Sequence, residues 1–197
     1  GQSTQNPFWE MCAQWMAYVY LPNKLFNDNE WLGNSLNGMH RHPMAGYLRY
    51  ENMFIQNWFV EKHGWDAVGR LWNDCDYGED PFQTYMRTRM EGTNAEKINQ
   101  LADEMWEWGA RMTTYDFESI RELGKNSINR RKQTALTKQS AGFWSPTKAD
   151  CIENYGNNAI QLNVPVAGRT VYAEFVGQAG REGYTAHNVT KAGWKYG

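Results

Sequence analysis

Apolar residues recur at helical spacing through the first two thirds of the chain. The clearest run lies between residues 94 and 113, where five apolar residues follow at intervals of three or four: Ile98, Leu101, Met105, Trp108 and Met112. This spacing predicts one long amphipathic helix whose apolar stripe packs against a core. Asn94 with Lys97 is expected to cap this helix without a complete capping box.

Four shorter helices are expected before the long one, because each has an apolar stripe bounded by proline, glycine or an aspartate. They run from Asn6-Pro7 to before Pro22, from Met44 to Gly64, from Asp66 to Trp72, and onward from Asp80-Pro81. Between the first two, a stretch through Asn34, Asn37 and Gly38 is rich in turn-forming residues and predicts turns rather than a helix.

The composition changes near residue 125. Residues 126–139 are polar and basic, with Arg130, Arg131, Lys132 and Lys138 among them. A solvated linker or helix end is the favoured interpretation, and an anion-binding patch is the alternative. Further along, residues 159–164 and 170–176 alternate apolar and polar positions around a turn at 165–168, which predicts a β-hairpin.

These patterns predict an α+β chain in three parts. A mainly helical subdomain is expected over residues 1–125, a linker over 126–150 and a small antiparallel β module over 151–197. Within the β module, four apolar side chains are expected to be mostly buried: Ile160, Leu162, Val171 and Phe175. Both ends of the chain are expected to be truncated relative to a longer protein.

Composition narrows the class of protein. The 197 residues carry 20 Lys and Arg against 22 Asp and Glu, so a basic excess of the kind that nucleic-acid binding requires is not present. No apolar run approaches the roughly 20 residues of a membrane span. Ten Trp, 11 Tyr and 8 Phe argue against disorder, and such rings either pack in a core or line a cleft.

Complete catalytic signatures are absent from the sequence, so any site must be argued from fragments. His40 and His42, just before Pro43, could share a metal, although a packed loop is the commoner explanation of such a pair. Cys12 lies on the apolar side of the first helix and is expected to be an unreactive thiol.

Glu10 is a carboxylate in an otherwise apolar helix, where it is either a first-turn residue favoured by the helix dipole or held for a purpose. The segment Pro-Phe-Trp-Glu-Met-Cys-Ala-Gln-Trp, residues 7–15, resembles the helix that supplies the third zinc ligand of gluzincin peptidases, typically Trp-x-x-Glu-Gly-x-Ala-x-Tyr. The resemblance implies a zincin-like subdomain, with Glu10 as a ligand of a zinc cofactor in the full-length protein.

A wider resemblance covers roughly residues 7–197. The chain is similar to a family of secreted bacterial proteins of unknown function, itself similar to gluzincins, with a β module behind its helices. This likeness implies a secreted, periplasmic or cell-surface location. It is carried by residues 40–43 (His-Arg-His-Pro), 49–50 (Arg-Tyr), 58–64 (Trp-Phe-Val-Glu-Lys-His-Gly), 79–86 (Glu-Asp-Pro-Phe-Gln-Thr-Tyr-Met) and 151–165.

Two functions follow as hypotheses. The resemblance implies a zinc-dependent peptidase, or a catalytically silent relative, acting on peptides or glycoconjugates, with His40, His42 and Tyr50 as candidates to line the cleft or polarise a carbonyl. The His-Glu-x-x-His helix of gluzincins is not in this chain, and Met11 and Gln14 stand where Gly and Glu are usual.

The alternative is a non-enzymatic peptide- or glycan-binding or structural secreted protein on the same scaffold. In that case tryptophan rings would stack on the ligand, with five candidates: Trp9, Trp15, Trp31, Trp58 and Trp72.

Overall fold

The computed structural model describes residues 6–27, 29–44, 50–140, 142–162 and 166–170. Most of the regular structure in this part of the chain is helical, with one short antiparallel sheet. The elements are α1 (Asn6–Tyr20), α2 (Pro22–Leu25), α3 (Asn29–Gly38), α4 (Ile55–His63), α5 (Ala67–Asn73), α6 (Pro81–Arg89), α7 (Asn94–Met112), α8 (Arg121–Gly124), the 3₁₀ helix η2 (Lys125–Arg130), β1 (Leu136–Lys138), β2 (Trp144–Pro146) and the 3₁₀ helix η3 (Lys148–Asp150). None of the helices in these ranges combines the length and the apolar character that crossing a membrane requires.

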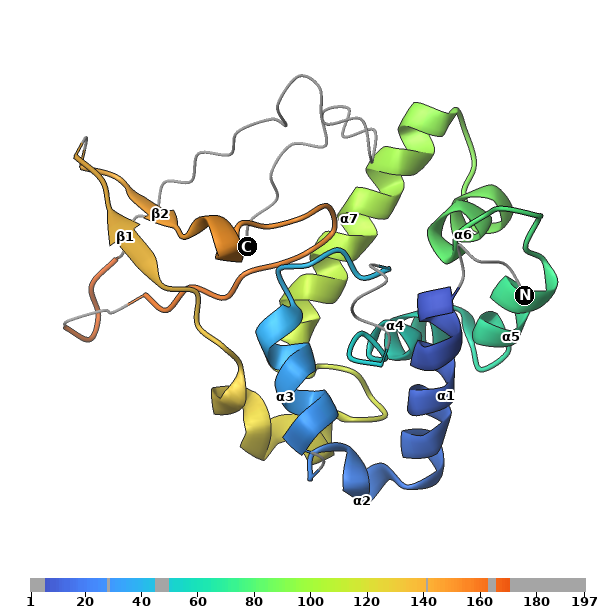
Figure 1. Ribbon diagram of the computed structural model, residues 1–197, viewed down its shortest axis with the longest axis horizontal. Helices are drawn as coiled ribbons and strands as arrows, with labels where there is room; N and C mark the ends of the chain where they lie inside the picture. Colours follow the sequence, from blue (N-terminus) through green and yellow to red (C-terminus); the bar gives the residue numbers. More distant parts are fainter. Residues whose placement is uncertain (1–5, 28, 45–49, 141, 163–165, 171–197) are drawn as a thin grey trace.

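Helix α7 is the longest element and runs through the middle of the molecule (Figure 1). Helix α3 lies on one side of it, and α1, α4, α5 and α6 gather on the other, with α1 against α4, α4 against α5, and α6 against α7. The strands β1 and β2 form a hairpin that stands apart from the helices, with Leu136 opposite Pro146.

The helices share one aromatic core, as the sequence predicts. Eight aromatic side chains are almost completely buried in it: Phe8, Phe54, Trp58, Phe59, Tyr85, Trp108, Tyr115 and Phe117. They come from α1, α4, α6, α7 and the segments before α4 and after α7. Burial of rings of this size is the main source of favourable free energy for a helical bundle.

The predicted long helix is confirmed over Asn94–Met112, and its stripe buries Leu101, Met105, Trp108 and Met112. The predicted cap is wrong by one residue. Thr93 is the N-cap, its hydroxyl accepts a hydrogen bond from the Glu96 amide, and the Glu96 carboxylate accepts one from the Thr93 amide. This reciprocal pair is a complete capping box, with Thr as N-cap and Glu three residues later.

The prediction of turns through Asn34 and Gly38 is also wrong, because these residues lie in α3. Helix α3 forms despite its asparagines and glycines because Leu32 and Leu36, one turn apart, are both buried in the core. Tertiary packing here outweighs weak helix propensity. Of the helix predicted from Met44 to Gly64, the described part is helical from Ile55, residues 50–54 form turns, and residues 45–49 lie outside the described residues.

Of the predicted α+β fold, the coarse composition is confirmed, because the described residues form mostly helices and one small antiparallel sheet. The described residues 159–162 are not a strand, and Leu162 is exposed, so its predicted burial is wrong, whereas Ile160 is partly buried. The antiparallel pair lies instead at β1 and β2, within the expected linker. Val171 and Phe175 lie outside the described residues, and the division into three parts stays a prediction.

Residues 153–159 pack against the helical part. The Glu153 amide donates to the His40 carbonyl at 2.8 Å, and the Asn157 amide donates to the Met39 carbonyl at 2.8 Å, so the chain lies across the C-terminal end of α3. Gly156 is required at this crossing, because a Cβ there would lie 2.3 Å from the His40 carbonyl oxygen.

Candidate functional site

Glu10 lies on the second turn of α1 and its side chain is half-buried. Its neighbour Trp9 is partly exposed and stacks on Trp72 of α5, with ring centroids 6.0 Å apart. Within the described residues, no hydrogen bond or ion pair reaches the Glu10 carboxylate. Glu10 is therefore a half-buried carboxylate to which no described residue donates.

His40 and His42 lie two residues apart in the segment after α3, and they belong to no metal-binding group of described residues. His40 is buried, and burial, followed by the charge of Arg41, lowers its pKa below the usual value. The Nδ1 atom of His42 accepts a hydrogen bond from the Met44 amide at 3.0 Å, and its ring packs edge-on against Tyr155. Both histidines hold residues 39–44 against the segment that crosses α3.

Tyr50 lies elsewhere, with its ring 4.6 Å from the ring of Trp31 on α3. Its amide donates to the Glu51 carboxylate at 3.0 Å. The candidate catalytic residues of the sequence thus fall in two places, and no described contact joins them to Glu10.

The described residues do not fit a zinc ion. A zinc site needs three or four nitrogen, sulfur or oxygen ligands, and no group of three His, Cys, Asp or Glu side chains in these residues could hold a metal. Burial raises the pKa of the Cys12 thiol to about 12, so the thiol is protonated at neutral pH. Its Sγ accepts hydrogen bonds from Trp72 and Gln56, as expected for an unreactive thiol.

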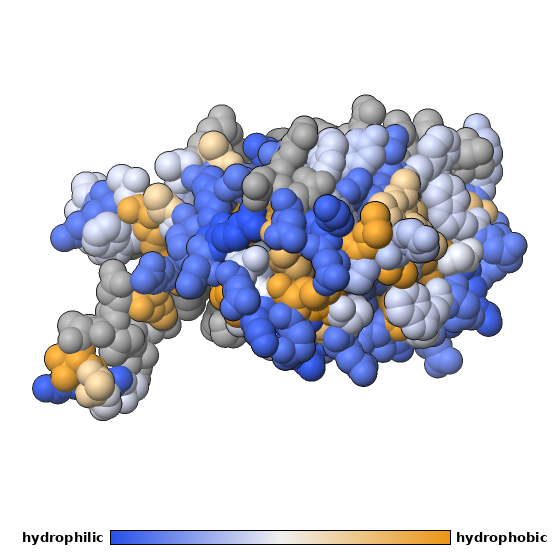
Figure 2. Space-filling model, turned by 90° about the horizontal axis from the view of Figure 1, so that it is seen from below, coloured by the Kyte–Doolittle hydropathy of each residue, from blue (hydrophilic) through white to orange (hydrophobic). Residues whose placement is uncertain are grey.

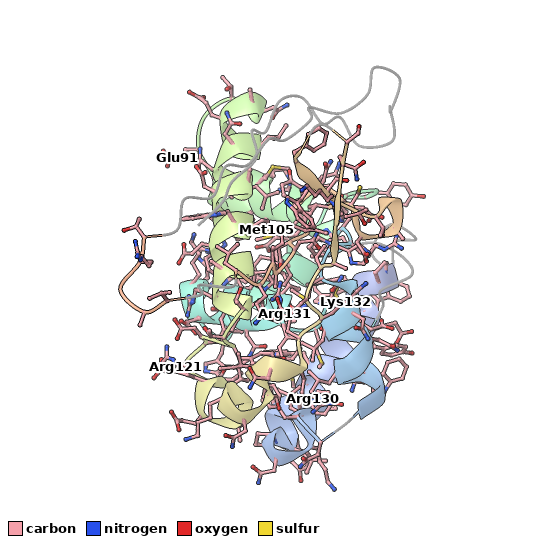
Figure 3. The ribbon with its side chains drawn as sticks, turned by 90° about the vertical axis from the view of Figure 1, so that its left-hand side faces the viewer. Glu91, Met105, Arg121, Arg130, Arg131 and Lys132 are labelled. Carbon is pink, nitrogen blue, oxygen red and sulfur yellow. The ribbon has the colours of Figure 1, made fainter. Side chains whose placement is uncertain are left out.

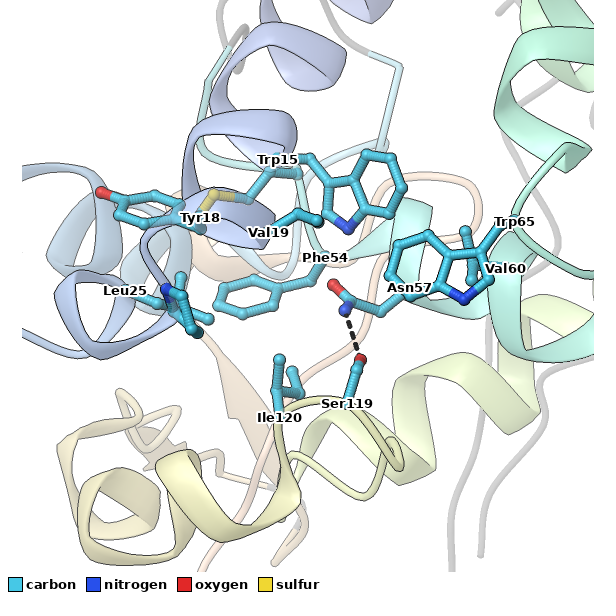
Figure 4. A pocket seen from close by; sticks show the side chains of 12 residues that line it. Trp15, Tyr18, Val19, Leu25, Phe54, Asn57, Val60, Trp65, Ser119 and Ile120 are labelled. Atoms are coloured by element: carbon cyan, nitrogen blue, oxygen red, sulfur yellow. Dashed lines mark hydrogen bonds between the residues drawn. The ribbon is translucent and has the colours of Figure 1, made fainter.

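A hollow among the described residues lies between α1, α4 and residues 119–120, and we call it the α1–α4 pocket (Figure 4). Its volume is about 230 Å³. Phe54 forms part of its floor, and Trp15 and Trp65 form a wall, with ring centroids 5.8 Å apart and planes tilted by 30°. The other lining residues are Tyr18, Val19, Pro22, Leu25, Met53, Asn57, Val60, Ser119 and Ile120.

The pocket carries few polar groups and no Asp, Glu, Lys, Arg or His among its described lining residues. The Asn57 amide donates to the Ser119 hydroxyl at 3.0 Å. The indole Nε1 of Trp15 is buried without a described hydrogen-bond partner, and in Figure 4 it lies on the edge of the ring directed towards Asn57. The pocket therefore offers a mainly apolar volume with few polar groups in its lining.

The mouth of the α1–α4 pocket lies at the protein surface. Trp65 is 63% exposed, and Val19, which also lines the pocket, is exposed too. The face shown in Figure 2 is mostly hydrophilic, with separate apolar patches between the charged side chains. Apolar side chains held at a surface hollow are typical of a binding site.

Sequence reasoning found only part of this site. Trp15 was a candidate stacking residue and does line the pocket, whereas Trp58 is core. Trp65 was missed, although its position directly after the helix-ending Gly64 is a signal for an aromatic ring in an exposed loop.

Comparison with known proteins identifies a family but no function. No match was found among curated proteins or among solved structures. The sequence matches a family of unknown function, DUF6055, over residues 1–197, and the chain therefore belongs to this family.

Proposed function

We propose that the chain is a peptide-binding module whose α1–α4 pocket takes an apolar side chain of its ligand. The observation that carries the proposal is a mainly apolar surface pocket of about 230 Å³ that is walled by Trp15 and the exposed Trp65. This proposal develops the non-enzymatic alternative of the sequence analysis.

The size and lining of the pocket select the ligand class. Pockets for drug-sized molecules span roughly 300–1,000 Å³, so this smaller pocket suits one or two apolar side chains. Trp15 Nε1 can donate to a peptide carbonyl, and the Trp65 ring can cover the side chain from solvent. A glycan would present many hydroxyl groups, and the lining offers no charged side chain and few polar groups to receive them: those of Trp15, Tyr18, Asn57, Trp65 and Ser119.

Calorimetric titration with short capped peptides tests the proposal. Peptides of the form Gly-Gly-X-Gly-Gly, with X as Leu, Phe or Lys, are compared with a chitin or cellulose oligosaccharide. We expect binding with Leu or Phe, weaker binding with Lys, and no binding of the sugars. Trp65→Ala should weaken binding about tenfold or more, because exposed aromatic anchors carry much of the affinity at such sites.

Trp106→Ala is the matched control, because Trp106 is also a partly exposed tryptophan but lies on α7 and does not line the pocket. It should leave the affinity unchanged. Equal losses in both variants, or no binding of any peptide, would refute the peptide proposal, and binding of the oligosaccharide alone would move the assignment to glycans.

A zinc peptidase, or a silent relative of one, is the second candidate function. It is favoured by one observation, the half-buried Glu10 carboxylate to which no described residue donates. In a full-length protein that supplies two histidines, Glu10→Gln should abolish zinc binding measured by titration, with an unchanged melting temperature in chelator. Glu107→Gln, at an exposed position on α7, is the control. Zinc affinity that survives Glu10→Gln removes Glu10 from the ligand set.

A further inference from the structure

Arg131 is buried, although its sequence context predicts a solvated basic segment. It directly follows η2, between Arg130 and Lys132, which are both exposed, yet its own exposed fraction is 5%. Figure 3 shows Arg131 below Met105 of α7, in the interior of the protein. A guanidinium keeps its charge at any physiological pH, so this position places a positive charge inside the fold.

The carboxylates near Arg131 are already paired with other cations. Lys132 and Asp150 form one ion pair at 2.5 Å, and Arg41 and Glu153 form another at 3.0 Å. The acidic group that acts on Arg131 among the described residues is Tyr115, whose pKa burial raises to about 12, so the phenol is neutral. The charge of Arg131 therefore has no counter-charge in the described structure.

Three unpartnered polar atoms gather beside Arg131. Its Nη2 donates to the side-chain Oδ1 of Asn157, but its Nη1 has no described acceptor. Asn157 Nδ2 and His40 Nε2 are also buried without partners. Arg131 and Asn157 present N–H donors, and His40 does so in the tautomer that carries its proton on Nε2.

These residues line one small hollow, which we call the Arg131 pocket, between the end of α3 and the chain from 131 to 159. Its volume is about 10 Å³, about one water-sized sphere. Asp150 also lines the hollow, but its carboxylate already accepts hydrogen bonds from Lys132 and from the Thr147 hydroxyl, so the groups without partners are donors. An occupant that only accepts hydrogen bonds and carries negative charge satisfies both the donors and the guanidinium.

We propose that the Arg131 pocket binds one small inorganic anion of the size of chloride, held by Arg131, Asn157 and His40. The bound ion neutralises the buried guanidinium and fixes the crossing segment on α3. The site is separate from the α1–α4 pocket, with which it shares no lining residue, and its occupancy does not depend on the proposed peptide binding.

Thermal unfolding of the full chain in sodium chloride against sodium gluconate, at equal ionic strength, tests the proposal. Gluconate is too large for the pocket and serves as the reference anion. We expect chloride to raise the melting temperature along a saturation curve, by about 3 to 5 °C when its concentration is ten times its Kd. No chloride effect in the unmodified protein overturns the proposal.

Two variants separate a site from general salt effects. Arg131→Met keeps an unbranched apolar stem without the guanidinium and should abolish the chloride-dependent rise, while Arg130→Met, at the exposed neighbouring position, should retain it in full. Equal responses in both variants overturn the proposal. If Arg131→Met does not fold, bromide in crystals of the unmodified protein decides the question: an anomalous peak beside Arg131 supports the site, and its absence overturns it.

Discussion

The α1–α4 pocket and the Arg131 pocket differ in what their walls require. The α1–α4 pocket measures about 230 Å³ and is walled mainly by aliphatic and aromatic side chains. The Arg131 pocket measures about 10 Å³ and is walled by Arg131, His40 and Asn157, each with an unpartnered atom. An apolar hollow can stand open to solvent at modest cost, whereas a hollow lined by buried donors is costly without an acceptor. The smaller hollow is therefore the more costly one to leave without an occupant.

The largest effect is expected at the floor of the α1–α4 pocket. Phe54 is 1% exposed and its ring lies 5.9 Å from that of Tyr115. Phe54→Ala should destabilise the protein by about 3 to 5 kcal/mol in chemical denaturation, because it removes a buried ring and leaves a cavity. Phe143→Ala, at an exposed position, should change the stability by less than about 0.5 kcal/mol. Comparable losses for both would show that Phe54 is not part of a packed core.

The next effect is expected beside the Arg131 pocket, where the chain crosses α3. Gly156→Ala would place a Cβ against the His40 carbonyl, and backbone must shift to accommodate it. The expected loss is about 1 to 3 kcal/mol, together with a loss of the chloride response. Gly69→Ala in α5 meets no atom within 4 Å and should stabilise the protein by about 0.5 to 1 kcal/mol. A neutral Gly156→Ala would mean that the crossing is not close-packed.

A comparison of Asn157→Ala with Arg131→Met sharpens the difference between removing a partner and removing the charge itself. Asn157→Ala leaves the guanidinium without its described acceptor and should cost about 1 to 3 kcal/mol in gluconate buffer. Arg131→Met removes the charge together with its need for a partner and should be nearly neutral or stabilising there. Denaturant midpoints of the two variants measure this contrast, and the reverse order would contradict a buried unpaired charge.

The smallest effect concerns pH. Burial and Arg41 lower the pKa of His40 below 6.5 in the folded protein, so the unfolded chain takes up a proton first as the pH falls. Stability is therefore expected to fall as the pH drops below about 6.5, until the folded-state pKa has been passed. Asp150, Glu153 and Lys132 also act on this histidine, with opposing signs. His40→Gln should show a smaller loss between pH 7.5 and 5.5 in gluconate, and an undiminished loss would exclude His40 as the source.

Local signals predicted a good part of the helical fold. Pro22 and Gly64 mark helix ends, Asp80-Pro81 marks a start, and the stripe from Leu101 to Met112 is strong enough to specify α7 by itself. The failures occurred where local chemistry and packing disagree. Asn34 and Gly38 favour turns in isolation, but burial of Leu32 and Leu36 makes α3 helical.

The candidate sites depended still more on the tertiary structure. The sequence identified Glu10, His40 and His42 as notable side chains, but their positions along the chain carry no information on which of them meet. His40 meets Arg131 and Asn157 at the Arg131 pocket, and both partners lie more than ninety residues further along the chain. Trp15 and Trp65 form one wall although fifty residues separate them.

The sequence by itself determined the class of the molecule: a charge-balanced, aromatic-rich chain with amphipathic helices around a shared core. Those properties follow from the spacing and composition of residues, which act over one or two helical turns. Only the tertiary structure decided that Arg131 is buried while Arg130 and Lys132 are exposed. Adjacent residues of the same type have the same local propensity, and the packing of residues 153–159 across α3 is what encloses one of the three.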